Sequence, residues 1–115
     1  MLKVLIIDDE APARNRLRRM LVEVPSVEIA GEAATGQDAL EMMPGSAANV
    51  LLLDISMPGM DGMELVKHVQ GEWPELPIVL VTAHGTIDAA VQAMRHGATD
   101  FLLKPCTPDS LEIVL

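Results

Sequence analysis

Five polar residues of this sequence follow directly on short apolar runs: Asp8, Asp9, Asp54, Thr82 and Lys104. Ligands of open α/β sheets bind at the carboxyl ends of parallel strands, so these positions could carry chemistry. Three carboxylates that converge at such an edge would repel one another unless a cation lay among them. Oxygen ligands in small number suit Mg²⁺, which keeps several waters and shares its remaining positions with phosphate. The sequence therefore predicts a magnesium site, with an amine and a hydroxyl placed to bind phosphate oxygens.

Each of these residues taken alone also has an ordinary structural explanation. Asp8 or Asp9 could cap the helix that follows. Thr82 could be a strand residue with a satisfied hydroxyl, and Lys104 could be a solvated surface charge. A shared site is favoured by the joint occurrence, because four separate strand ends supply complementary groups.

The elements that must position these residues alternate along the chain. Apolar runs lie at residues 4–7, 27–30, 50–53, 78–81 and 101–103. Most are too continuous for strands with one wet face, so they predict buried parallel strands. Segments with the apolar spacing of helices lie between them. Parallel strands need crossover helices, so the order predicts an α/β fold with a doubly wound five-stranded parallel sheet.

Two of the predicted helices are short. Residues 37–43 form one of them, which we expect to end at Pro44 and Gly45. For the last helix only residues 108–115 remain, about two turns at 3.6 residues each. A helix of that length is marginal unless it docks on the rest of the domain.

Composition limits the function classes. The 115 residues suit a single domain, and 17 acidic against 8 basic side chains give a net charge of −9. This charge repels nucleic acids and anionic membranes, so the domain itself is not expected to bind DNA. A single cysteine, Cys106, excludes an internal disulfide and fits a reducing cytoplasm. The first apolar run is far too short for a membrane span, which predicts a soluble, cytoplasmic domain.

Four stretches of the sequence resemble the receiver domains of two-component response regulators. They are VLIIDDE at 4–10, LLLDISMPGMDG at 51–62, VLVTAHG at 79–85 and DFLLKP at 100–105. The resemblance covers the chain up to its shortened last helix and implies the flavodoxin-like strand order 2-1-3-4-5. It implies a phosphorylation-activated switch rather than an enzyme. We expect residues 1–115 to be one receiver domain, the N-terminal domain of a longer regulator that is cut within its fifth helix.

The resemblance also implies roles for the acidic residues. Asp54 matches the aspartate that accepts a phosphoryl group and also binds Mg²⁺. Asp9 matches a direct ligand of the metal, whereas Asp8 matches a second acid that acts on it largely through water. The backbone carbonyl of Ser56 matches a further ligand.

The remaining matched residues would read the phosphate. Thr82 and Lys104 match two phosphate contacts, and the bond between Lys104 and Pro105 matches a cis peptide. Phe101 lies where the family places its aromatic switch residue. The resemblance implies that phosphorylation draws Thr82 toward the phosphate and that Phe101 moves into the vacated space. The surface formed by the fourth helix, the fifth strand and the fifth helix would then change shape.

The implied partner is a sensor histidine kinase or a histidine-phosphotransfer protein. The switch surface is a candidate for homodimer contacts. Residues 83–105 are similar to receivers that control transcription, so we expect an output through DNA. The first helix carries four arginines, which are either a solvated face paired with nearby acids or a docking surface for the phosphotransfer helices. They are Arg14, Arg16, Arg18 and Arg19.

Two other protein classes use a similar sheet. Phosphatases or phosphotransferases of the haloacid-dehalogenase type also have an aspartate nucleophile and Mg²⁺, but they place a second acid two residues later, where this chain has Ser56. A flavodoxin would need a loop rich in glycine and hydroxyl groups after the first strand. Here that loop begins with Asp8 and Asp9, which would repel the flavin phosphate.

Overall fold

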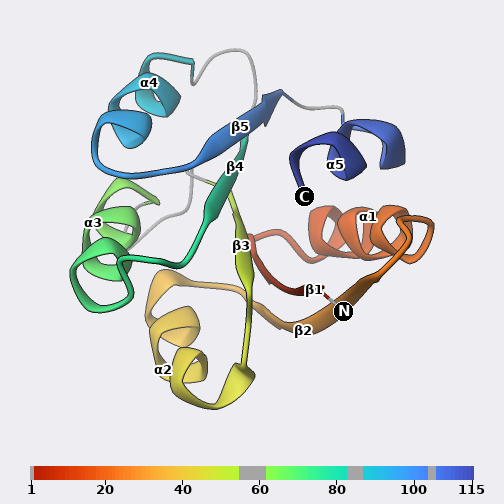
Figure 1. Ribbon diagram of the computed structural model, residues 1–115, viewed down its shortest axis with the longest axis horizontal. Helices are drawn as coiled ribbons and strands as arrows, with labels where there is room; N and C mark the ends of the chain where they lie inside the picture. Colours follow the sequence, from red (N-terminus) through yellow and green to blue (C-terminus); the bar gives the residue numbers. More distant parts are fainter. Residues whose placement is uncertain (1, 55–61, 83–86, 104–105) are drawn as a thin grey trace.

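The computed structural model describes residues 2–54, 62–82, 87–103 and 106–115. Strands and helices alternate along these ranges (Figure 1). The strands are β1 (Leu2–Ile7), β2 (Val27–Ala33), β3 (Val50–Leu53), β4 (Ile78–Thr82) and β5 (Asp100–Leu103). The helices are α1 (Ala11–Val22), α2 (Gly36–Ser46), α3 (Gly62–Glu72), α4 (Ile87–Arg95) and α5 (Pro108–Val114). In the part of the chain that the structure describes, no helix is long and apolar enough to cross a membrane.

The five strands form one parallel sheet in the order β2-β1-β3-β4-β5. This order confirms the predicted fold class and the flavodoxin-like topology. Each helix packs on one face of the sheet: α1 and α5 cover one side, while α2, α3 and α4 cover the opposite side (Figure 1).

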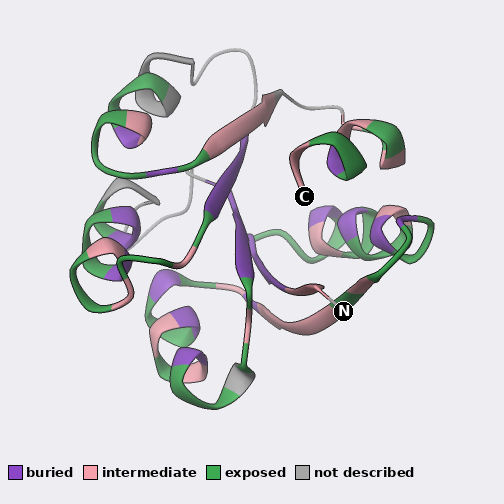
Figure 2. Ribbon diagram, viewed as in Figure 1, coloured by how far each residue is buried: buried purple, intermediate pink, exposed green. Residues whose placement is uncertain are grey.

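Side-chain alternation along the strands builds two cores, one on each face of the sheet. Leu5 and Ile7 of β1 point toward α2, α3 and α4, whereas Val4 and Ile6 point toward α1 and α5. All four side chains are buried, because successive residues of a strand face opposite sides and both sides are covered (Figure 2). This double burial explains why the strand was visible in the sequence as a continuous apolar run.

Two predicted boundaries were wrong. The edge strand β2 continues to Ala33, beyond residues 27–30, because it has a neighbour on one side only and keeps partly exposed polar residues such as Glu32, which no apolar run reveals. Helix α2 passes through Pro44 and ends at Ser46. A proline lacks one N–H group, yet the residues after it can keep helical angles for the last turn. The left-handed Ala47 (φ 55°) then ends the helix.

Helix α5 is short, as predicted, and it docks against α1. The Thr107 hydroxyl accepts a hydrogen bond from the Ser110 backbone N–H at 3.1 Å, and the Ser110 hydroxyl accepts one from the Thr107 N–H at 2.9 Å. This capping box fixes the start of the helix. Leu111 is fully buried in the same core cluster as Leu17 and Leu21 of α1. Packing of Leu111, together with the partly buried Val114 and Leu115, therefore offsets much of the cost of forming so short a helix.

We predict that Leu111→Ala destabilises the domain by about 2–5 kcal/mol, since it removes buried methyl groups and leaves a cavity. Ile113 on the same helix is 85% exposed, so Ile113→Ala should change stability by no more than about 0.5 kcal/mol. Urea unfolding followed by far-ultraviolet circular dichroism measures both values. Equal effects of the two variants would contradict docking through Leu111.

Candidate metal centre

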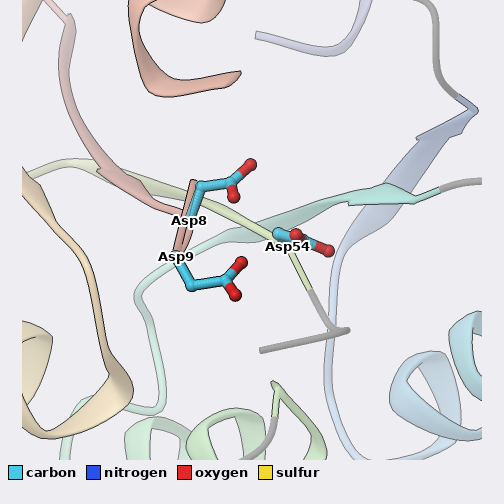
Figure 3. Close-up of side chains that lie close together, drawn as sticks. All are labelled: Asp8, Asp9 and Asp54. Atoms are coloured by element: carbon cyan, nitrogen blue, oxygen red, sulfur yellow. The ribbon is translucent and has the colours of Figure 1, made fainter. Parts of the chain in front are cut away.

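Three carboxylates meet at the carboxyl edge of the sheet. Asp8 and Asp9 follow β1, Asp54 follows β3, and one oxygen of each lies within 4.8 Å of an oxygen of the other two. Figure 3 shows the three side chains extending toward the same side of the strand ends. Asp8 is fully buried and Asp54 is 6% exposed, while Asp9 faces solvent.

Strand register explains why the acids converge. Ile7 and Leu53, the last residues of β1 and β3, are direct partners in the parallel ladder. The Asp54 amide N–H donates to the Ile7 carbonyl at 2.9 Å, so the ladder extends one residue past the end of β3. The Asp8 N–H likewise donates to the Ala33 carbonyl of β2 at 3.1 Å. Backbone pairing thus fixes where both carboxylates start.

The turn after β1 differs from a simple helix cap. Glu10 occupies the N-cap position of α1, and its side chain makes no capping hydrogen bond within the described ranges. The Asp8 Oδ1 instead accepts from the Glu10 N–H at 3.0 Å, which closes a turn ahead of the helix. The structural alternative that Asp8 or Asp9 occupies the cap of α1 is therefore wrong.

The donor set fits a hard divalent cation. Mg²⁺ binds oxygen ligands at about 2.1 Å in an octahedron, so opposite ligands lie about 4.2 Å apart. Neighbouring ligands of the same octahedron lie about 3.0 Å apart. One oxygen each of Asp8, Asp9 and Asp54 lies within 4.8 Å of the other two, so the three carboxylates are close enough to share one ion after the side chains adjust. Asp9 is exposed, so its carboxylate remains in contact with water.

Of the other predicted site residues, the structure describes only Phe101 and the backbone of Thr82. Thr82 ends β4 opposite Leu103 of β5, which brings its backbone to the same edge of the sheet, while its side chain lies outside the described part of the chain. Phe101 is half-buried on β5 and packs against the core cluster beneath α2, α3 and α4. Ser56, Lys104 and Pro105, together with the predicted cis peptide, lie outside the described residues.

One contact of the acidic turn was missed at the sequence level. The Arg14 Nη1 donates to the backbone carbonyl of Asp8 at 2.7 Å. In the sequence Arg14 is one of four similar arginines on a helix. Only its spacing of six residues from Asp8 could have indicated the contact. That spacing does not predict a hydrogen bond unless the geometry of the turn between the two residues is known.

Comparison with known families gives a match over most of the chain. The family described as "Response regulator receiver domain" matches residues 4–115. Among solved structures, NtrX from Brucella abortus superimposes with a TM-score of 0.90 at 34% sequence identity. The match covers 99% of this chain and 26% of NtrX.

Curated relatives differ in what their names say they do. Regulatory protein LuxO of Vibrio cholerae is 48% identical over 81 residues, 70% of this chain and 18% of LuxO. The C4-dicarboxylate transport transcriptional regulatory protein DctD of Pseudomonas aeruginosa is 42% identical over 95% of this chain and 23% of its own length. A protein-glutamate methylesterase/protein-glutamine glutaminase of Halalkalibacterium halodurans is 41% identical over 97% of this chain and 33% of its own. The chain therefore spans a third or less of each of these three relatives.

We predict that Asp9→Asn weakens Mg²⁺ binding more than Asp8→Asn. One oxygen of Asp8 already accepts a hydrogen bond from the Glu10 N–H, whereas Asp9 is exposed to solvent. Loss of Asp9 should cost at least about tenfold in affinity, the smaller end of what outer-shell changes cost at metal sites. Titration of Mg²⁺ by isothermal calorimetry ranks the two variants, and the reverse order would mean that their roles are exchanged.

Proposed function

Because the chain belongs to the response regulator receiver family, we propose that Asp54 is its phosphoacceptor and that Asp8, Asp9 and Asp54 together hold Mg²⁺. The observation that carries the proposal is the convergence of these carboxylates at one sheet edge. The comparisons give no support to a phosphatase of the haloacid-dehalogenase type. The domain acts as a switch that promotes its own phosphorylation.

Transfer from a phosphohistidine requires little chemistry from the protein beyond positioning. An Asp54 oxygen attacks phosphorus, the bond between phosphorus and the donor's imidazole nitrogen breaks, and that nitrogen leaves with the electron pair. Bound Mg²⁺ would offset the negative charge of the carboxylate and of the phosphoryl oxygens. Asp54 is 6% exposed, and this burial supports a nucleophile whose carboxylate is restrained by its surroundings. Lys104 and Thr82 would bind the phosphoryl oxygens.

In the proposed switch, a movement of Thr82 toward the phosphate would be followed by a movement of Phe101. Phe101 has no hydroxyl group, so a hydrogen bond from a ring cannot mark the active state and packing must do so. Its half-buried position on β5 supports a ring that can become more buried. Helices α4 and α5 expose the apolar residues Val91 and Ile113, which supports a binding surface formed by α4, β5 and α5. Homodimer formation through that surface remains part of the proposal.

The four arginines of α1 fall into two pairs, which supports docking of a phosphotransfer helix on this face. Arg14 and Arg18 both form ion pairs with Glu32 of β2. Arg16 and Arg19 instead line a cavity of about 500 Å³. Its other described lining residues are Ala13, Leu17, Met20, Val81 and Cys106. We place an apolar side chain of the kinase or phosphotransfer protein in this cavity, with acidic neighbours beside the two arginines.

The output of the whole protein is a further proposal. DctD is named as a transcriptional regulator, which supports control of transcription. The methylesterase relative carries a different activity, so a receiver of this kind is compatible with more than one effector. The charge of −9 makes DNA binding by the receiver itself unfavourable.

We predict that a small phosphodonor such as acetyl phosphate labels the wild-type domain on Asp54 only when Mg²⁺ is present. Asp54→Asn should take up no label, because an amide is not a nucleophile for phosphorus under these conditions. Mass spectrometry of peptides locates the modified residue. Full labelling of the variant, or full labelling of wild type in excess chelator, would contradict the assignment.

A second expectation separates docking from chemistry. Arg16→Ala should slow transfer from a phosphorylated histidine-phosphotransfer protein by roughly tenfold, since it removes a cation that steers the partner. It should leave labelling by acetyl phosphate unchanged. Arg18→Ala removes the same charge from the same helix but from the pair with Glu32, and it should transfer at nearly the wild-type rate. Equal rates for Arg16→Ala and wild type would refute docking beside the cavity.

A further inference from the structure

Arg14 connects the acidic turn with the edge strand of the sheet. Its Nη1 donates to the Asp8 carbonyl at 2.7 Å, and its Nε lies 3.5 Å from the Glu32 Oε1 on β2. Both side chains are mostly buried, with 19% and 16% of their surface exposed. Arg18 binds the other carboxylate oxygen of Glu32. The guanidinium group of Arg14 therefore has two fixed partners on two different segments.

We propose that Arg14 is a positioning residue of the metal site, an inference that rests on the proposed Mg²⁺ binding by Asp8, Asp9 and Asp54. Arg14 holds the peptide group between Asp8 and Asp9. A peptide group is planar, so a hydrogen bond that fixes the Asp8 carbonyl also fixes the orientation of the Asp9 N–Cα bond. Arg14 thereby orients the exposed carboxylate that closes the metal site.

The hydrogen bonds around Asp8 support this role. The Asp8 N–H is held by the Ala33 carbonyl, and its Oδ1 is held by the Glu10 N–H. Arg14 supplies the bond to the backbone carbonyl. A charged donor makes a stronger hydrogen bond than a neutral one, so this contact is well suited to restrain the turn. The exposed Asp9 has no burial to restrain it and depends on the backbone for its position.

Charge alone predicts the opposite effect of Arg14. A guanidinium group beside a cluster of carboxylates repels a divalent cation, so its removal would strengthen Mg²⁺ binding by Coulomb's law. The ion pair with Glu32 reduces this repulsion and also sets the direction of the guanidinium plane. The sign of the change in Mg²⁺ affinity on removing Arg14 therefore separates positioning from simple electrostatics.

The test is a Mg²⁺ titration of the 115-residue chain, followed by the amide nuclear magnetic resonance shifts of residues 8–10 and 54. Arg14→Ala should bind Mg²⁺ about tenfold more weakly, the lower end of the effect of outer-shell partners at metal sites. Arg14→Lys keeps the charge and can reach one of the two partners but not both, so it should recover part of the affinity. Arg18→Ala removes an equal charge from the same Glu32 network and should bind like wild type.

Wild-type or tighter binding by Arg14→Ala, with normal binding by wild type, would overturn this inference and leave the proposed function intact. A weakening of equal size in Arg18→Ala would also overturn it, because a general loss of the Glu32 network would then be the cause. If Arg14→Ala does not fold, Arg14→Lys decides in its place, and unaltered affinity of that variant overturns the inference. A wild-type chain without Mg²⁺-dependent shifts at these residues overturns both this inference and the proposed metal site.

Discussion

Repulsion among Asp8, Asp9 and Asp54 is the constraint on which the account of this domain depends. Two of the three carboxylates are almost fully buried, where water can do little to screen them. Main-chain pairing holds Asp8 and Asp54 at adjacent strand ends, so the backbone gives these charges no means of moving apart. The divalent cation that we propose here would remove that conflict, and it would also prepare a carboxylate to accept an anionic phosphoryl group. The stability of the edge and its chemistry are thus linked.

The rest of the fold keeps this edge rigid. Apolar side chains fill both faces of the sheet, with α1 and α5 on one side and α2, α3 and α4 on the other. Leu51, Leu52 and Leu53 of β3 are fully buried immediately before Asp54. A shift of β3 by one residue would exchange the faces of its side chains and carry a polar end residue, Asn49 or Asp54, into the apolar interior. The packed core therefore fixes the strand ends from which Asp8 and Asp54 extend.

Much of this arrangement was predictable from the sequence, and particular residues show where prediction stopped. The positions of Asp8, Asp9 and Asp54 followed from apolar runs that end at the carboxyl edge, because burial on both faces leaves an unmistakable pattern. The full length of β2 did not follow, since an edge strand keeps polar residues such as Glu32. The different roles of the arginines did not follow either. Arg14 and Arg18 differ from Arg16 and Arg19 through their ion pairs with Glu32 on another segment, and Arg14 differs from Arg18 through its hydrogen bond to the Asp8 carbonyl.

The most direct measurement of the central claim uses Mn²⁺, a paramagnetic ion that prefers oxygen ligands in octahedral geometry as Mg²⁺ does. Added in substoichiometric amounts, it should broaden the amide resonances of Asp8, Asp9 and Asp54, and excess Mg²⁺ should restore them. Glu72 and Glu75 lie beyond the opposite ends of the strands and provide an internal control that should stay sharp. Uniform broadening, or broadening centred on those two glutamates, would show that the three aspartates do not form the metal site.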